Sequence, residues 1–171
     1  MPRVFVSIGS NIEPERNIRA AVRALRAGFS NLAMSPVFES KAEGFEGNDF
    51  YNCAARFDTN DPLDRLCERL GRIEADHGRV RTGKRFSPRT LDIDVLLYGD
   101  LVRHDKRFDI PRRDILAYAH VLGPLVALAP DLRHPETGER LADRWQKFAN
   151  KDSLREISVD FDDTGRPGVT G

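Results

Sequence analysis

The run Thr90-Leu91-Asp92-Ile93-Asp94-Val95-Leu96-Leu97-Tyr98-Gly99-Asp100 carries the strongest strand signal in the chain. Aliphatic residues dominate from Leu91 to Tyr98, which predicts a strand with one buried face. Side chains alternate along a strand, so Asp92 and Asp94 are expected on one face and the aliphatic residues between them on the other, against helices. Strand geometry then separates the Cα atoms of the two aspartates by roughly 7 Å.

Three strands and two helices are predicted before this run. Short β-rich segments predict strands at residues 4–8, 37–39 and 50–57. Apolar residues at helical spacing predict a helix around residues 18–25 and a second helix with Asp61 as N-cap, Pro62 at N1 and an end at His77-Gly78. The polar, glycine-containing residues 41–49 predict a loop of functional length.

The remaining elements follow the run. Gly99-Asp100 is typical of a two-residue hairpin turn into Leu101-Val102. Helical segments are predicted at residues 115–129 and 141–148. Residues 158–171 contain turn formers and little to bury, so we expect a disordered tail there and a single domain over residues 1–157.

The predicted order β-α-β-β-α-β is the ferredoxin-like, split β-α-β arrangement. We therefore predict an α+β fold with a mostly antiparallel sheet. The two early helices are expected on one face of the sheet and the C-terminal helices on the other, which gives three layers, α/β/α.

The composition excludes several classes of protein. Among 171 residues there are 27 Lys plus Arg and 27 Asp plus Glu, so bulk charge would not hold the chain on nucleic acid. Cys53 and Cys67 are too few for a disulfide framework, and we expect both in the core. No apolar run reaches the ~20 residues of a membrane span, and no signal-peptide pattern is present. We expect a cytoplasmic protein without a membrane partner.

A basic segment precedes the aspartate pair: from Arg79 to Arg89 there are five basic residues and no acidic one. Mg²⁺ in proteins is commonly held by one or two carboxylates together with substrate phosphates. Arginines supply forked donors for phosphate oxygens. The pattern favours a Mg-nucleotide or polyphosphate site, and the alternative is a half-exposed strand with a polar outer face.

One motif in this segment is misleading. Gly78, Gly83 and Lys84 match part of a Walker A loop, but Arg85 stands where Ser or Thr is required. The segment also follows a helix and opens a strand, which is the reverse of the Walker context. We therefore reject a Walker A site.

The motifs taken together resemble the 6-hydroxymethyl-7,8-dihydropterin pyrophosphokinase family. They are Ser7-Ile8-Gly9-Ser10-Asn11, Phe50-Tyr51-Asn52, Gly78-Arg79-Val80-Arg81 and Arg85-Phe86-Ser87-Pro88-Arg89-Thr90-Leu91-Asp92-Ile93-Asp94. The resemblance covers residues 4–148 in order. It implies transfer of diphosphate from ATP to the hydroxymethyl group of a dihydropterin, with release of AMP, in folate biosynthesis.

The resemblance also implies roles for individual residues. Asp92 and Asp94 would hold two Mg²⁺ ions, and Arg79 and Arg89 would clamp the triphosphate of the co-substrate ATP. Residues near the nucleotide would be Glu74, Arg81, Arg85, Phe86, Arg107, Asp109 and Arg112. The dihydropterin would contact Ser40, Glu43, Phe50, Asn52 and His120. No nucleic acid partner is implied, and a monomer is expected.

Several positions depart from the residues usual in that family, and most of them cluster around the substrates. They are Lys41-Ala42-Glu43-Gly44 in the pterin loop, Phe86, Ser87, Arg112 and His120. His120 replaces an aromatic residue of the pterin sandwich and makes stacking there pH-dependent. Two alternatives therefore stay open: a diverged paralogue that pyrophosphorylates a modified pterin-like acceptor, and a non-catalytic nucleotide- or RNA-binding module.

Overall fold

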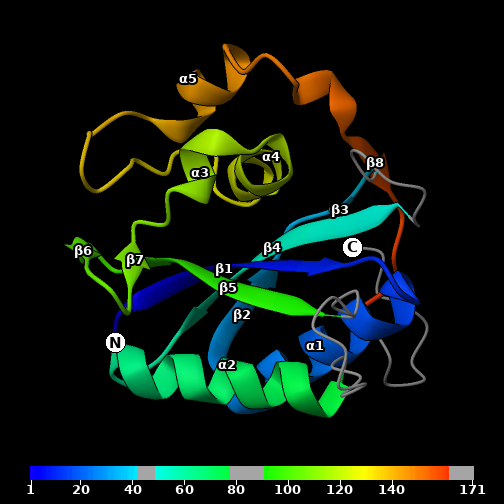
Figure 1. The fold of residues 1–171 in the computed structure, drawn as a ribbon, viewed down its shortest axis with the longest axis vertical. Coiled ribbons are helices and arrows are strands. Elements are labelled where there is room, and N and C mark those ends of the chain that lie inside the picture. The colour runs from blue at the N-terminus through cyan, green and yellow to red at the C-terminus, as the bar shows by residue number, and fades with distance from the viewer. Residues whose placement is uncertain (42–48, 78–90, 162–171) are drawn as a thin grey trace.

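The computed structural model describes residues 1–41, 49–77 and 91–161 of the chain (Figure 1). Its strands are β1 (Arg3–Ser10), β2 (Ser30–Met34), β3 (Val37–Ser40), β4 (Phe50–Asp58), β5 (Asp92–Tyr98), β6 (Arg103–His104), β7 (Asp109–Ile110) and β8 (Arg155–Ile157). Its helices are α1 (Pro14–Gly28), α2 (Leu63–His77), α3 (Asp114–Ala117), α4 (Ala119–Leu128) and α5 (Leu141–Gln146), with a 3₁₀ turn, η1, at Lys151–Ser153.

The main sheet has the order β5-β1-β4-β3-β8, and β2 also pairs with β4. Every pairing in it is antiparallel. The central strands are β1 and β4, and each is followed by a helix before the chain re-enters the sheet. Apart from the additional short strand β2, the elements up to β5 follow the predicted β-α-β-β-α-β order, so the ferredoxin-like α+β prediction is confirmed.

Helices cover both faces of the sheet. Figure 1 shows α1 and α2 below it and α3, α4 and α5 above it. The lower layer buries one cluster of apolar side chains, which includes Val4, Val6 and Ile8 of β1. The upper layer buries a second cluster around Phe5, Leu122 and Leu125. The alternation of β1 residues between the two clusters follows directly from strand geometry and confirms the three-layer prediction.

The apolar stripes predicted for the two lower helices are the buried ones. In α1 the side chains of Ile18, Ala21, Val22 and Leu25 are all completely inaccessible to solvent. In α2 the buried residues are Leu63, Leu66 and Leu70, and Cys67 and Ile73 pack against the same cluster. The spacing of these residues places them on one side of each helix, toward the sheet.

A β-bulge orients the far end of β5. Phe5 pairs with Leu97 and Val6 with Val95, so Leu96 is the extra residue. Leu96 and Leu97 then both lie in the upper cluster. Before the bulge, the side chains of β5 alternate regularly between the two faces of the sheet. Ile93 and Val95 therefore face the lower cluster, and Asp92 and Asp94 face the upper layer.

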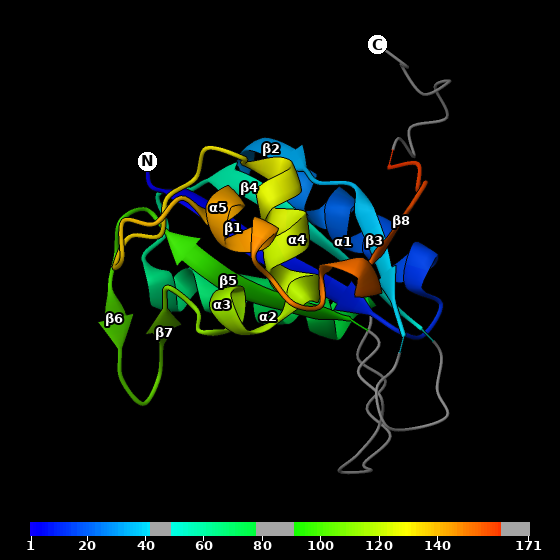
Figure 2. The same cartoon turned by 90° about the horizontal axis from the view of Figure 1, so that it is seen from above.

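The hairpin predicted after β5 is wrong. Gly99 does turn the chain, with φ of +51° and a backbone hydrogen bond of 3.0 Å from the Leu101 N–H to the Tyr98 carbonyl. Residues 101 and 102 are not in a strand, and Leu101 packs against the lower cluster. The next strand, β6, pairs with β7 instead, and Figure 2 shows this small hairpin projecting at the opposite end of the sheet from β3 and β8.

Other element boundaries differ from the predicted ones. The strands β2 and β8 were not predicted; each is short and pairs only with a distant segment. The predicted helix 115–129 is two helices, because Tyr118 is extended at φ −126°, ψ 130°. Helix α2 begins at Leu63, and the Asp61 carboxylate instead forms an ion pair with Arg69.

The end of the chain is described only to residue 161. Val159 and Phe161 are partly buried against the lower cluster. Residues 162–171 of the expected tail lie outside the described residues. In the part of the chain that the structure describes, no helix is long and apolar enough to cross a lipid bilayer.

Candidate active site

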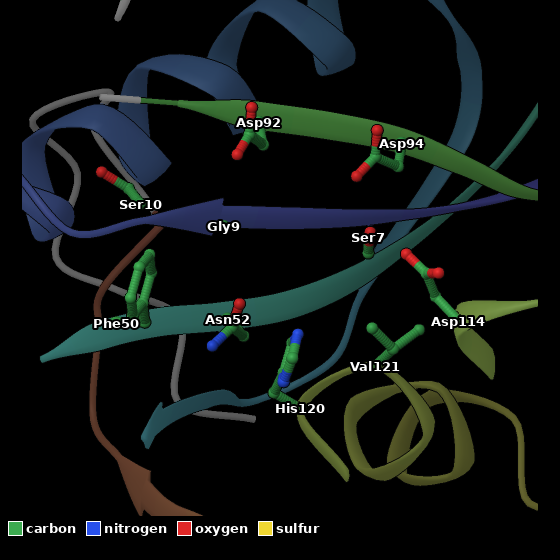
Figure 3. A pocket seen from close by; sticks show the side chains of 10 residues that line it. All are labelled: Ser7, Gly9, Ser10, Phe50, Asn52, Asp92, Asp94, Asp114, His120 and Val121. Atoms are coloured by element: carbon green, nitrogen blue, oxygen red, sulfur yellow. The ribbon is translucent and has the colours of Figure 1, made fainter. Parts of the chain in front are cut away.

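The strand register gathers polar residues from the sequence at one place on the upper face of the sheet. Asp92 of β5 lies beside Gly9 of β1, and Gly9 lies beside Asn52 of β4. Two residues further along β5, Asp94 lies beside Ser7 of β1. Helices α3 and α4 close over this part of the sheet and leave a pocket of about 130 Å³ (Figure 3). Its lining residues are Ser7, Gly9, Ser10, Phe50, Asn52, Asp92, Asp94, Asp114, His120 and Val121.

Asp92 and Asp94 present both carboxylates to this pocket. Figure 3 shows the two side chains on the same side of β5, above β1. The residues between and after them, Ile93 and Val95, are only 4% and 7% exposed on the opposite face. The alternation expected from the sequence therefore holds at this strand.

The carboxylate pair fits a cation that brings other ligands with it. Within residues 1–41, 49–77 and 91–161, no group of three or more His, Cys, Asp or Glu side chains is arranged to hold a metal ion by itself. Mg²⁺ usually takes only one or two carboxylates and completes its shell with water and substrate phosphates. The donor set in the pocket suits that arrangement rather than a closed structural site.

Asn52 is held in the wall of the pocket. Its side chain is 8% exposed, and its amide nitrogen donates to Ser40 Oγ at 3.3 Å. A Cβ atom on Gly9 would lie 2.9 Å from Asn52 Oδ1, closer than such contacts occur. The glycine therefore leaves room for the asparagine amide over β1.

Two rings line the pocket from different layers. Phe50 begins β4, and His120 lies in the first turn of α4 (Figure 3). The His120 ring stacks on Tyr118, with 5.2 Å between ring centroids. A buried amide between two ring-bearing walls is a suitable arrangement for a flat, polar heterocycle. Of the residues predicted for a pterin, Ser40, Phe50, Asn52 and His120 are thus together, and Glu43 lies outside the described residues.

Asp114 is a third carboxylate of the pocket, and sequence reasoning missed it. It opens α3 and forms an ion pair with Arg112, with 3.0 Å between Arg112 Nε and Asp114 Oδ2. A second guanidinium nitrogen of Arg112 lies 3.9 Å from Asp94 Oδ1. Burial disfavours the charged form of Arg112, but the carboxylates of Asp94 and Asp114 outweigh it and raise the pKa of the guanidinium. No spacing in the sequence links Asp114 to the β5 aspartates, because α3 alone brings it there.

Two other predicted nucleotide contacts, Arg107 and Asp109, are in the β6–β7 hairpin and do not line the pocket. The Arg107 guanidinium lies 5.0 Å from the centre of the Phe108 ring. Asp109 accepts from the Arg113 backbone N–H at 3.0 Å and pairs with His104 Nδ1 at 2.6 Å. Burial works in the opposite direction, but these contacts keep the pKa of Asp109 below its ordinary value.

Glu74 is a predicted nucleotide contact that does not line the pocket. Glu74 lies in α2, in the layer below the sheet. The residues of the basic segment lie outside the described residues, and their roles stay predictions: Arg79, Arg81, Arg85, Phe86 and Arg89. The two cysteines were expected in the core, and Cys53 is buried while Cys67 packs at its edge.

The fold and the pocket together define a class: a ferredoxin-like α+β protein with a small-molecule site between paired carboxylates on β5 and a ring-lined wall on β4 and α4. Residues 5–130 match the profile of the 7,8-dihydro-6-hydroxymethylpterin-pyrophosphokinase (HPPK) family. Since the match spans well over half of the chain, this protein belongs to that family.

Known proteins of the same family are similar along most of the chain. The 2-amino-4-hydroxy-6-hydroxymethyldihydropteridine pyrophosphokinase of Pseudomonas aeruginosa is 44% identical over 139 residues, which are 78% of this chain and 85% of that protein. The enzyme of the same name from Haemophilus influenzae is 34% identical over 161 residues, 91% of this chain and 98% of that protein.

A solved structure shares the fold. Plasmodium falciparum HPPK-DHPS, crystallised with pterin and p-hydroxybenzoate, superimposes with a TM-score of 0.70 at 13% identity. The superposition covers 92% of this chain but only 45% of the Plasmodium chain, so this chain spans about half of that protein. At that identity the likeness supports the fold alone.

Proposed function

We propose that this protein transfers the β- and γ-phosphates of ATP, as one diphosphate group, to the hydroxymethyl group of 6-hydroxymethyl-7,8-dihydropterin, a step of folate biosynthesis. The hydroxymethyl oxygen forms a bond to the β-phosphorus and loses its proton. The bond from the β-phosphorus to the oxygen that bridges it to the α-phosphorus breaks, and AMP leaves. Family membership and the names of the relatives support this reaction.

One observation carries the proposal: the paired carboxylates and the ring-lined wall belong to the same pocket. A diphosphate transfer needs the acceptor hydroxyl within bonding reach of the donor phosphorus. A flat heterocycle bound at Phe50, Asn52 and His120 would lie beside Asp92 and Asp94, which line the same pocket. The acceptor hydroxyl could then lie next to the phosphates of the donor.

The residues of the pocket divide between the two substrates. Asp92 and Asp94 would hold Mg²⁺, two ions by resemblance, and bound Mg²⁺ neutralises phosphate charge and polarises the acceptor hydroxyl. Asn52 presents its amide to the polar edge of the pterin, and Phe50 and His120 contact its faces. Arg79 and Arg89 would bind the phosphates from the basic segment.

The non-catalytic alternative is not favoured. An RNA-binding module of this topology reads bases with exposed aromatic residues on a basic sheet face. The corresponding face here carries Asp92 and Asp94, and Asp114 of α3 lines the same pocket; these carboxylates repel a phosphate backbone unless cations intervene. We expect the protein to act as a monomer, without nucleic acid or membrane partners.

The proposal is tested by following AMP release from ATP and Mg²⁺ with and without 6-hydroxymethyl-7,8-dihydropterin. AMP that appears only with the pterin supports the proposed reaction and its acceptor. Mg-dependent ATP binding without turnover of this pterin would instead favour the paralogue with a modified acceptor, in keeping with His120. Release of ADP rather than AMP would contradict diphosphate transfer.

A further inference from the structure

Asp114 shares the pocket with the β5 aspartates but is not part of a metal-binding cluster with them. It lines the same space as Asp92 and Asp94 (Figure 3), yet within the described ranges these carboxylates do not form a three-ligand metal group. Its contact is with Arg112, at 3.0 Å. The function of Asp114 is therefore to be sought in what it does to this arginine.

The Arg112 guanidinium is shared unequally between two carboxylates. Its Nε lies at hydrogen-bond distance from Asp114 Oδ2, whereas the nitrogen that faces Asp94 is 3.9 Å from Asp94 Oδ1. The second distance is too long for a hydrogen bond but within the range of an ion pair. Asp114 thus holds the nearer and better-oriented contact.

The backbone of Arg112 does not decide this preference. Its N–H donates to the Leu96 carbonyl of β5 at 3.0 Å, and its carbonyl accepts from the Ile115 N–H at 3.1 Å. These bonds attach residue 112 between the sheet and α3. With the backbone held, only side-chain rotation separates the observed position from one in which the guanidinium closes on Asp94.

A guanidinium that closed on Asp94 would compete with a cation for the same oxygens. Arginine remains charged at all accessible pH values and binds carboxylates through two parallel hydrogen bonds. Mg²⁺ in this pocket depends on few protein ligands, so occupation of one of them by Arg112 weakens its binding.

We propose that Asp114 is a positioning residue that keeps Arg112 from closing on Asp94 and so limits the competition between Arg112 and Mg²⁺ for that carboxylate. This inference rests on the proposed function, because it assigns the cation of Mg-ATP to the β5 aspartates. It concerns a carboxylate outside the sequence motif and gives Arg112 a second role besides its predicted contact with the nucleotide.

The test measures Mg²⁺-dependent nucleotide binding without turnover. The probe is α,β-methylene-ATP, in which the bond that would break is replaced by a stable one, titrated by calorimetry over a series of Mg²⁺ concentrations. The proteins are wild type, Asp114→Asn, Arg112→Gln and the double variant. Asp131→Asn is the matched control, because Asp131 also pairs with an arginine, Arg140 at 3.2 Å, but does not line the pocket.

We expect Asp114→Asn to raise the apparent Mg²⁺ dissociation constant on the order of 5-fold, the scale of one partly exposed ion pair. The same substitution made in the Arg112→Gln background is expected to change it less than about 2-fold, since no guanidinium is left to close on Asp94. Asp114→Glu, which keeps the charge, is expected to behave as wild type, and Asp131→Asn likewise. If Asp114→Asn does not fold, Asp114→Ser takes its place.

Two results would overturn the inference. An equal loss of Mg²⁺ affinity in both backgrounds would mean that the Asp114 charge acts directly on the cation. An unchanged affinity in Asp114→Asn would mean that Arg112 is not restrained by Asp114. Absence of any Mg²⁺-dependent nucleotide binding in wild type would contradict the proposed function itself, which separates that failure from the other two.

Discussion

A missing methyl group at position 9 shapes the ring-binding part of the pocket. The hydrogen of Gly9 leaves space that Asn52 Oδ1 fills, and Asn52 in turn donates to Ser40. This relation depends on the register of β1 and β4, which sets residues 9 and 52 side by side. A glycine within a strand is otherwise unfavourable, so the presence of Gly9 in β1 is explained by the neighbouring Asn52 side chain.

Gly9→Ala is expected to displace the Asn52 amide and raise KM for the pterin by roughly 10-fold or more, the effect of losing one positioned hydrogen-bonding group. KM for ATP should change little, because the clash lies on the β4 side of the pocket. Steady-state kinetics with each substrate varied separately measures both. Gly71→Ala is the control, since a Cβ there meets nothing within 4 Å. Equal KM values for wild type and Gly9→Ala would contradict the role given to Asn52.

Asp94→Ala is expected to fold and to lose turnover by on the order of 100-fold or more, as for removal of a group that stabilises transition-state charge. Folding should survive because Asp94 is half-exposed, whereas the strand is held by Ile93 and Val95 in the core. Circular dichroism checks the fold, and AMP release checks the chemistry. Near-normal turnover in a folded variant would remove the two-carboxylate site from the mechanism.

At the scale of elements, His104 connects the β6–β7 hairpin to the segment before α5. Its Nδ1 lies 2.6 Å from Asp109 Oδ1, and its Nε2 contacts Glu136 Oε1. The hydrogen bonds with Glu136 and Asp109 raise the pKa of His104 above its ordinary value of 6.5. The charged imidazole therefore joins two segments that the sheet does not connect.

Because the pKa of His104 is raised in the folded state, its contribution to the stability of the fold decreases as the pH rises. The stabilisation by His104 is fully present below the unfolded-state value of about 6.5 and is lost as the pH rises through the higher folded-state value. His104→Gln should thus lower Tm most at about pH 6 and much less at about pH 9, a comparison that thermal unfolding makes directly. His77→Gln, at the exposed end of α2, serves as the control. A Tm difference between wild type and His104→Gln that grows with pH would contradict this role of His104.

The elements that could be predicted are those specified by local periodicity. The stripes of α1 and α2 and the alternation in β5 depend on residues close in sequence, so both helices and the facing of Asp92 and Asp94 followed from the sequence. The pairing of β8 with β3 joins residues far apart along the chain, as does the packing of Leu101 against the lower cluster, where a hairpin strand was predicted. Asp114 was missed for the same reason, since only tertiary packing brings it beside Asp94.

For the whole molecule, the two helical layers differ in what they contribute: one mainly buries apolar side chains, and the other also lines the pocket. The lower layer, with α1 and α2, covers the larger apolar cluster, whereas the upper layer contributes Asp114, His120 and Val121 to the pocket. Among the residues that the structure describes, the side chains that line the pocket therefore come from the sheet and the upper helical layer.

The rate at which a thiol reagent modifies each cysteine tests whether the lower layer opens only when the whole protein unfolds. Burial raises the pKa of the Cys53 thiol to about 12, and the side chain lies within the lower cluster. Cys67 is only partly buried at the edge of that cluster. Under native conditions we expect a thiol reagent to modify Cys67 first and Cys53 at the rate of global unfolding. Cys53 labelling faster than unfolding, with Cys67→Ser as background, would show that the lower layer opens locally.

The fate of the ATP phosphates tests the proposed reaction most directly. Phosphorus NMR of a reaction with ATP, Mg²⁺ and 6-hydroxymethyl-7,8-dihydropterin distinguishes transfer of two phosphates from transfer of one. We predict that the β- and γ-phosphorus both appear in a diphosphate ester of the pterin and that the α-phosphorus appears in AMP. A pterin monophosphate together with ADP, or ATP left intact beside a bound pterin, would contradict diphosphate transfer in this pocket.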